Sequence, residues 1–184
     1  MLYIRKYEEK DLDNVRYTCL HSENEEPEKT FAEFVLHTFC DYYIQREPEN
    51  CFVLDDNGRA VGYIICTENY DRYKEIFDKD YLPLTESQGE EFYNWAKTST
   101  VLQNKYKDIY PAHLHIDLLP DYQRQGWGGK LLNTLFEHLR AKGIKGVMLT
   151  AGTENVNAGS FYKKYGFEQV EIYNTDVAFG MKLQ

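Results

Sequence analysis

The stretch AHLHIDLLPDYQRQGWGGK, residues 112–130, decides the fold of this chain. Residues 112–119 alternate between polar and apolar side chains, which predicts a strand with one polar and one apolar face. The polar face carries three titratable side chains, His113, His115 and Asp117. Pro120 breaks the strand, and from Trp127 onward the apolar residues follow a helical stripe. A strand, a glycine-rich turn and a helix therefore follow one another.

The turn between this strand and this helix, QRQGWGGK, has the chemistry of an anion cradle. Its glycines let the backbone approach an anion, and the helix start supplies N–H groups without intrahelical partners. Arg124 and Lys130 add positive charge. A Walker loop is excluded, because Arg124 and Leu131 stand where it requires Gly and Ser or Thr. The dinucleotide fingerprint lacks its third glycine. The alternative is a turn whose glycines serve only close packing.

The rest of the chain is predicted to continue this α/β order. Before the quoted stretch we expect a strand at 2–7, a helix capped by Asp11, one amphipathic helix at 30–45 and a hairpin of strands at 51–54 and 60–66. Residues 68–110 are polar and aromatic, are helical near 70–77 and 86–97, and are interpreted as an insertion. After the stretch we expect a helix ended by Gly143, a strand at 146–150, a helix at about 157–165 and strands at 167–173 and 177–183.

Length and composition favour one globular domain over residues 1–184. The chain is 42% hydrophobic and 28% charged, which argues against disorder and fibrous classes. The net charge of −9 repels phosphate backbones and anionic membranes, so we expect neither a nucleic acid nor a membrane as partner. The acidic surface serves solubility or attracts a cationic substrate. The chain has neither a signal peptide nor an apolar run of about 18 residues, so we expect a cytoplasmic protein. Four widely spaced cysteines are expected to be reduced thiols.

Two motifs give the chain a resemblance to a known family, the GCN5-related N-acetyltransferases (GNAT). The first is the strand end and turn carried by Leu118, Leu119, Pro120, Gln123, Gly126 and Gly128. The second lies after the next strand and is carried by Asn155, Ala158, Phe161, Tyr162, Gly166 and Phe167. The resemblance is strong over residues 112–184. The HIDLLP strand and the long segment before it also resemble the acetyltransferase-like C-terminal domains associated with O-GlcNAc hydrolases.

The resemblance implies a fold, a cosubstrate and a set of binding residues. The fold is a single mixed, mostly antiparallel sheet of six or seven strands with helices on both faces, in which strands four and five splay apart. The cosubstrate is acetyl-coenzyme A, which enters between those strands. The residues implied to bind it are Leu118 and Leu119 through their backbone, the turn residues Gln123, Arg124, Gln125, Gly126, Trp127, Gly128, Gly129 and Lys130, and the helix-start residues Asn155 and Ala158.

For the chemistry, the resemblance implies direct attack of an amine on the acetyl thioester. Tyr162 would protonate the departing thiolate, although a packed aromatic is the alternative. Asp117 is the first candidate for the base, and His115 and His113 share its face and could form a relay. Family members often place an acid near Ala112, so Asp117 could be structural and the histidines non-catalytic. We expect no metal, because ligands two apart on one strand span roughly 13 Å.

The acceptor is less well defined by the sequence. A small-molecule or peptide amine is implied, and four nearby carboxylates, Glu23, Glu25, Glu26 and Glu28, hint at a cationic one. Exposed terminal strands of family members often pair, which would give a homodimer. The competing function is a non-catalytic binding module that recognises a protein or a glycan-bearing partner. It would use the aromatic residues of the insertion, namely Tyr70, Tyr73, Phe77, Tyr81, Phe92, Tyr93 and Trp95.

Overall fold

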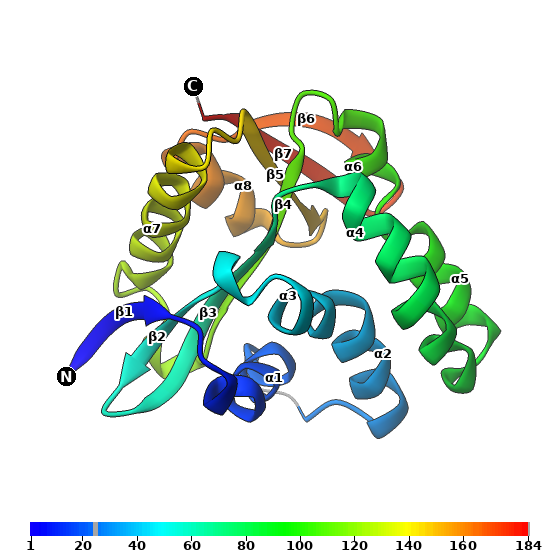
Figure 1. Cartoon of the computed structure of the whole chain (residues 1–184), viewed down its shortest axis with the longest axis horizontal. Coiled ribbons are helices and arrows are strands. Elements are labelled where there is room, and N and C mark those ends of the chain that lie inside the picture. Colours follow the sequence, from blue (N-terminus) through cyan, green and yellow to red (C-terminus); the bar gives the residue numbers. More distant parts are fainter. Residues whose placement is uncertain (24–25, 184) are drawn as a thin grey trace.

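The computed structural model describes residues 1–23 and 26–183, which build one seven-stranded sheet in the order β1-β2-β3-β4-β5-β7-β6 (Figure 1). Its strands are β1 (Leu2–Lys6), β2 (Phe52–Asp56), β3 (Arg59–Thr67), β4 (Ala112–Leu118), β5 (Gly146–Gly152), β6 (Glu168–Tyr173) and β7 (Asp176–Lys182). Every neighbouring pair is antiparallel except β4 and β5. This confirms the predicted mixed, mostly antiparallel sheet.

Strands β4 and β5 diverge soon after they meet. They are paired only where Ala112 faces Val147 and His113 faces Met148. Beyond these positions β4 stays paired with β3 as far as Leu118, and β5 stays paired with β7 as far as Gly152. The facing edges of β4 and β5 are therefore unpaired over their second halves, which confirms the predicted splay and opens the middle of the sheet.

Helices cover both faces of the sheet. They are α1 (Leu12–His21), α2 (Lys29–Phe39), α3 (Asp41–Arg46), α4 (Tyr70–Ile76), α5 (Glu90–Thr98), α6 (Val101–Tyr106), α7 (Trp127–Ala141) and α8 (Val156–Lys164). Short helical turns are η1 (Glu9–Asp11), η2 (Pro48–Asn50), η3 (Phe77–Tyr81), η4 (Leu82–Gln88) and η5 (Pro120–Tyr122). One hydrophobic core lies between helices α1–α5 and one face of the sheet. A second core lies between α7 and the other face.

Two local predictions were wrong. The helix expected at 30–45 is interrupted at Cys40, whose φ of −127° and ψ of −60° are not helical, so that α2 and α3 point in different directions. Asp11 does not cap α1 with its side chain. Its buried carboxylate instead accepts hydrogen bonds from the Arg5 guanidinium and from the Glu8 backbone, because an ion pair at this buried position is the stronger partner.

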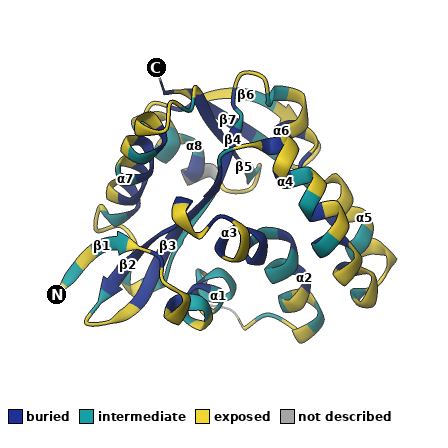
Figure 2. Cartoon of the chain, in the orientation of Figure 1, coloured by how far each residue is buried: buried dark blue, intermediate teal, exposed yellow. Residues whose placement is uncertain are grey.

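The segment between β3 and β4 is helical throughout, but its aromatic residues are mostly core. Tyr70, Tyr73, Phe77 and Tyr81 are at most 4% exposed and pack on α3 and β3, whereas Trp95 is 47% exposed. Figure 2 shows α5 largely exposed, whereas α3, on which the buried aromatic residues pack, is largely buried. The aromatic content of this segment therefore reflects core packing, which removes the main observation in favour of a partner-binding surface.

The cysteines agree with the expectation of reduced thiols. All four cysteines are free thiols, of which Cys40, Cys51 and Cys66 are buried. Within residues 1–23 and 26–183, no helix has both the length and the apolar character needed to cross a membrane.

Candidate active site

Two cavities meet where β4 and β5 diverge. The first, of about 490 Å³, lies between the turn before α7 and the start of α8, and is lined by Gly126, Gly128, Ala158, Phe161 and Tyr165 among others. The second, of about 600 Å³, lies over the open edge of β5 and is lined by Glu23, His115, Thr150, Gly152 and Glu154 among others. Both share Ile116, Asp117, Gln123, Arg124, Asn155 and Tyr162. The shared residues form the passage between the two cavities.

The glycine-rich turn points a row of backbone donors at the first cavity. Arg124 and Gly126 have φ values of +57° and +85°, which turn successive N–H groups toward one side. In the part of the chain that the structure describes, no backbone N–H from Arg124 to Gly129 has a hydrogen-bond acceptor. The Arg124 side chain lines both cavities and also makes no ion pair there. The turn can therefore bind an anion.

The glycines of this turn also serve helix packing. A Cβ at Gly129 would lie 1.8 Å from the Tyr165 hydroxyl, and one at Gly128 would lie 3.1 Å from the Phe161 ring. The Tyr165 and Phe161 rings can therefore lie against α7 in these positions because both residues are glycine. Gly128 faces the first cavity as well, whereas Gly129 does not. Gly129 therefore serves packing alone, whereas Gly128 serves packing and also lines the cavity.

Not every residue expected to bind the coenzyme lines the first cavity. Leu119 has both backbone groups engaged: its N–H donates to Val61 (3.0 Å) and its C=O accepts from Tyr122 (2.9 Å). This differs from the expectation that it pairs with a ligand, and the reason is that alternate strand residues face opposite neighbours. Leu118, one residue earlier, faces the open edge instead. The predicted residues that line neither cavity are Leu119, Gln125, Trp127, Gly129 and Lys130.

Gln123 and Asn155 fix the two rims of the passage. The Gln123 amide donates to the Leu118 carbonyl (2.8 Å) and to the Ser22 carbonyl (2.7 Å), which ties the turn to the end of β4. The Asn155 side-chain oxygen accepts from the Ala158 N–H (3.1 Å) and so caps α8. Both side chains are therefore structural as well as cavity-lining.

Asp117 lies in the passage, partly covered by protein. Its Oδ2 accepts a 2.5 Å hydrogen bond from the hydroxyl of Tyr63, the residue opposite it on β3. Burial raises the pKa of Asp117 to about 6, although hydrogen bonds from Tyr63 and Ser22 lower it and the charge of Glu23 raises it further. The carboxyl group can therefore take or give a proton near neutral pH.

Tyr162 enters the passage from the opposite side, on α8. Its ring packs against Phe161, Phe167 and Phe179, with centroid distances from 5.2 to 5.6 Å. Its hydroxyl makes no hydrogen bond to a described residue. Burial raises the pKa of Tyr162, and the negative charge of Asp117 raises it further. The phenol is therefore neutral and can donate a proton or a hydrogen bond.

His115 lines the second cavity, but His113 does not. His113 is 1% exposed, and its Nε2 lies 2.9 Å from the hydroxyl of Tyr43 on α3. The same hydroxyl lies 3.1 Å from Nε2 of His115. Burial lowers the pKa of His115 to about 4 and lowers that of His113 as well. Neither imidazole bonds directly to Asp117, so the expected relay is not a direct contact.

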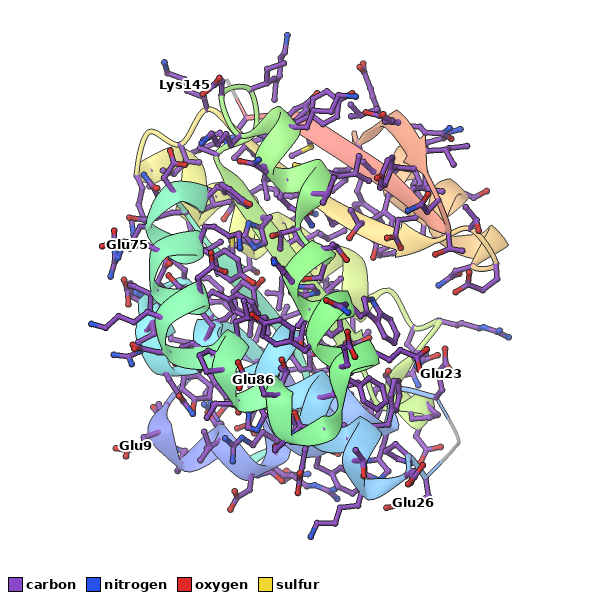
Figure 3. The ribbon with its side chains drawn as sticks, turned by 90° about the vertical axis from the view of Figure 1, so that its right-hand side faces the viewer. Glu9, Glu23, Glu26, Glu75, Glu86 and Lys145 are labelled. Atoms are coloured by element: carbon purple, nitrogen blue, oxygen red, sulfur yellow. The ribbon has the colours of Figure 1, made fainter. Side chains whose placement is uncertain are left out.

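The second cavity is acidic where it is charged. Asp117, Glu154 and Glu23 contribute carboxylates, and Arg124 is the cation among its lining residues. The Glu154 carboxylate folds over Gly152, where a Cβ would lie 2.0 Å from Oε1. Glu23, which Figure 3 labels, lies at the edge of the molecule. Glu25 lies outside the described residues. Among the residues that are described, no group of three His, Cys, Asp or Glu side chains could hold a metal ion.

Sequence analysis missed the two tyrosines that hold the polar face of β4. Tyr43 and Tyr63 come from α3 and β3, up to 72 residues away in sequence from their partners. A signal was present for Tyr63, because antiparallel pairing of β3 with the strand at 112–118 in the correct register places Tyr63 opposite Asp117. Nothing in the sequence marks Tyr43 among its many neighbouring aromatic residues.

The chain is similar to known proteins in sequence and in fold. The family model described as "Acetyltransferase (GNAT) family" matches residues 15–167. The crystal structure of SsHAT superposes with a TM-score of 0.88 and 28% sequence identity, covering 100% of this chain and 98% of that one.

Two curated relatives are similar over parts of their length. An uncharacterized N-acetyltransferase from Methanocaldococcus jannaschii is 26% identical over 131 residues, and a [ribosomal protein bS18]-alanine N-acetyltransferase from Escherichia coli is 29% identical over 93 residues. The matches cover 71% and 47% of this chain but only 44% and 62% of the relatives. Because the family model spans most of the chain, the protein belongs to the GNAT acetyltransferase family.

Proposed function

We propose that this protein is an acetyl-coenzyme A-dependent N-acetyltransferase, which transfers the acetyl group to a primary amine by direct attack on the thioester. The observation that carries the proposal is the junction of the two cavities, where Asp117 and Tyr162 stand in one passage. One cavity would hold the coenzyme and the other, here named the acceptor chamber, would hold the amine. Membership of the family and the relatives named as N-acetyltransferases support the same activity.

The first cavity suits the coenzyme on two counts. The unpaired N–H groups from Arg124 to Gly129 and the positive end of α7 suit a pyrophosphate. The unpaired edge of β4 near Leu118 suits the amide groups of a pantetheine arm, which would extend the sheet there. The backbone N–H of Leu118 can also donate to the thioester oxygen as negative charge develops on that oxygen. Of the expected binding residues, Leu118, Gln123, Arg124, Gly126, Gly128, Asn155 and Ala158 line this cavity.

Acetyl-coenzyme A supplies an activated acetyl group and a thiolate leaving group. Asp117 takes a proton from the acceptor ammonium at a carboxylate oxygen, which frees the nitrogen electron pair for attack. As the C–S bond breaks, Tyr162 gives its phenolic proton to the leaving sulfur. Tyr162 then regains a proton from solvent, and solvent receives the proton held by Asp117 and the remaining excess proton of the product nitrogen. Both residues are in the protonation states these steps need, because Asp117 ionises near pH 6 and Tyr162 is neutral.

The cradle is tested first by calorimetric titration with acetyl-coenzyme A. Arg124→Glu places a negative charge among the unpaired N–H groups, and the exposed Arg124 side chain makes no hydrogen bond or ion pair with a described residue. We expect at least about a tenfold loss of affinity, the effect of losing one charge-assisted contact and gaining repulsion. Lys145→Glu is the matched control. Lys145 is exposed, and it lies at the top of Figure 3, far from the turn.

Activity is tested by following thiol release with a panel of amines that includes a peptide with a free N-terminus, a lysine side chain and a polyamine. Acetylation of any of them by the wild-type protein supports the proposal. Tight binding of acetyl-coenzyme A without any amine-dependent thiol release would contradict it in favour of a coenzyme-binding module. Equal affinity in Arg124→Glu and Lys145→Glu would remove the turn from the coenzyme site.

A further inference from the structure

A hydrogen-bonded chain of three rings closes one wall of the acceptor chamber. The Tyr43 hydroxyl lies between Nε2 of His113, at 2.9 Å, and Nε2 of His115, at 3.1 Å. The two histidines alternate with apolar residues on β4, so both face α3, which carries Tyr43. The edge-on packing of the Tyr43 ring against both imidazoles fixes all three rings.

The two ends of this chain differ. At the closed end, His113 is walled in by the rings of Tyr70 and Tyr73 from α4, and its Nδ1 is buried without a partner among the described residues. At the open end, His115 lines the acceptor chamber. Its Nε2 is occupied by Tyr43, and its Nδ1, unlike that of His113, is not a buried unpaired atom. Nδ1 is therefore the nitrogen that His115 offers to the chamber.

If both neutral imidazoles donated to Tyr43, its own hydroxyl proton would have no acceptor, because the two imidazoles are its hydrogen-bond partners among the described residues. Two arrangements therefore remain. In one, His113 donates to Tyr43, Tyr43 donates to His115, and His115 carries its own proton on Nδ1. In the other, every bond is reversed, and the proton of His113 sits on its buried Nδ1 with no acceptor. Buried N–H groups without an acceptor are rarer in proteins than acceptors without a donor. The first arrangement is therefore favoured.

We propose that Tyr43 and His113 are positioning residues that hold His115 in the Nδ1–H form, so that His115 is a hydrogen-bond donor to the chamber and Asp117 is the proton acceptor. The proposal rests on the proposed function and goes further, because it assigns different roles to the two candidate bases, Asp117 and His115. In the step itself the amine N–H bond breaks and an O–H bond forms on Asp117. The nitrogen electron pair becomes the new N–C bond, the acetyl C–S bond breaks, and the leaving sulfur takes the proton of Tyr162. Asp117 and the product nitrogen each release a proton to solvent, and Tyr162 regains one from it. His115 orients the reacting groups and keeps its proton.

The groups around His115 agree with a neutral ring. Phe39 from α2 packs on its edge at a centroid distance of 5.7 Å, and Ile65 lies opposite it on β3. Tyr43 from α3 is uncharged, and the charged groups that share the chamber wall are Asp117, Glu23, Glu154 and Arg124. None of these four forms an ion pair or a direct hydrogen bond with the imidazole among the described residues.

The tautomer is tested directly by long-range ¹H–¹⁵N correlation spectra of protein labelled at its histidines, without any substrate. His115→Gln and His113→Gln assign the two rings. We expect the wild-type spectrum to show His115 with a protonated Nδ1 and a bare Nε2, and His113 with the opposite pattern. Tyr43→Phe should move His115 toward the Nε2–H form. A wild-type spectrum with His115 protonated on Nε2 would overturn the proposal.

A matched control is offered by Tyr73→Phe. It also removes a buried hydroxyl next to His113, but that hydroxyl makes no hydrogen bond to either imidazole. We expect the His115 pattern to stay as in the wild type. A change as large as that in Tyr43→Phe would show that the packing of the aromatic cluster, and not the Tyr43 hydrogen bonds, sets the tautomer.

Kinetics separate the two roles on an acceptor that the wild-type protein acetylates. The side-chain amide of His115→Asn places a donor near the position of Nδ1, so this variant should keep more of kcat than His115→Ala. Asp117→Asn should lose about 100-fold in kcat. Full loss in His115→Asn with activity kept in Asp117→Asn would make His115 the base. If no amine is acetylated, the proposed function fails, whereas the spectra still decide the tautomer.

Discussion

At the scale of single residues, Asp117 gives the site its expected pH dependence. Burial raises the pKa of its carboxyl to about 6, and only the ionised form can take a proton from the amine. We therefore expect kcat/KM to rise between pH 5 and pH 7 with a midpoint near 6. Asp117→Asn should remove this limb of the profile along with most of the activity. An unchanged limb in a residually active Asp117→Asn protein would assign it to another group.

The same raised pKa of Asp117 costs stability. The carboxyl titrates near 3.9 in the unfolded chain and near 6 in the folded one, so the folded state is penalised above pH 6 and not below about pH 4. Asp117→Asn keeps an acceptor for the Tyr63 hydroxyl and should stabilise the protein by about 1–2 kcal/mol at pH 7.5. At pH 4 the gain should vanish. Thermal unfolding at the two pH values measures it.

Tyr162 is the complementary case, in which a raised pKa keeps a phenol protonated. Tyr162→Phe retains the ring that packs on Phe161, Phe167 and Phe179, and removes only the hydroxyl. We expect kcat to fall about 100-fold while the affinity for acetyl-coenzyme A stays within twofold. Steady-state kinetics and calorimetry on the same preparation measure both. Full activity in this variant would reduce Tyr162 to a packing residue.

At the scale of elements, the sequence predicted the strands well because their edges are marked locally. Asn57 and Gly58, both with positive φ, end β2 and start β3, and Gly143 with φ of +74° ends the α7 segment. Where tertiary packing decides, prediction failed. Neither the break at Cys40 nor α6 at Val101–Tyr106 was predicted. Cys40 is buried in the core that α2 and α3 share with the sheet, and Leu102 of α6 packs with residues of β5 and β7.

The contact of Tyr165, at the end of α8, with Gly129 of α7 leaves no room for a Cβ. Gly129→Ala would place a Cβ 1.8 Å from the Tyr165 hydroxyl, so the Tyr165 ring would have to move. We expect a loss of about 1–3 kcal/mol in unfolding free energy. Tyr165→Leu in the same chain should restore part of it, because it removes the clashing ring. Additive effects of the two changes in a double-mutant cycle would contradict this contact.

At the scale of the whole molecule, the sequence predicted residues that line the first cavity better than it predicted the surroundings of the second. Gln123, Gly126 and Asn155 belong to motifs that are continuous in the chain, so local reading found them. The surroundings of Asp117 and His115 are assembled from β3, β4 and α3, and their partners Tyr63 and Tyr43 are set by strand register and helix docking. Long-range pairing of this kind leaves no local pattern in one sequence.

Part of the net negative charge of the chain lies at the acceptor chamber, so a cationic acceptor should show a salt dependence. Glu23, Asp117 and Glu154 line that cavity, and the charge of Glu23 acts on Asp117. A cationic amine would be attracted over a distance of about one Debye length, roughly 10 Å at 0.1 M salt. We therefore expect its KM to rise several-fold between 50 and 500 mM salt, with kcat little changed.

Glu23→Gln should raise KM for the cationic amine at low salt and flatten the salt dependence, because it removes one of the attracting charges. It should also move the midpoint of the pH profile slightly below 6, since Glu23 contributes to the raised pKa of Asp117. Glu75→Gln makes the same charge change on the opposite side of the view in Figure 3 and should alter neither quantity. Equal effects of the two variants would mean that the net charge, and not the chamber, attracts the acceptor.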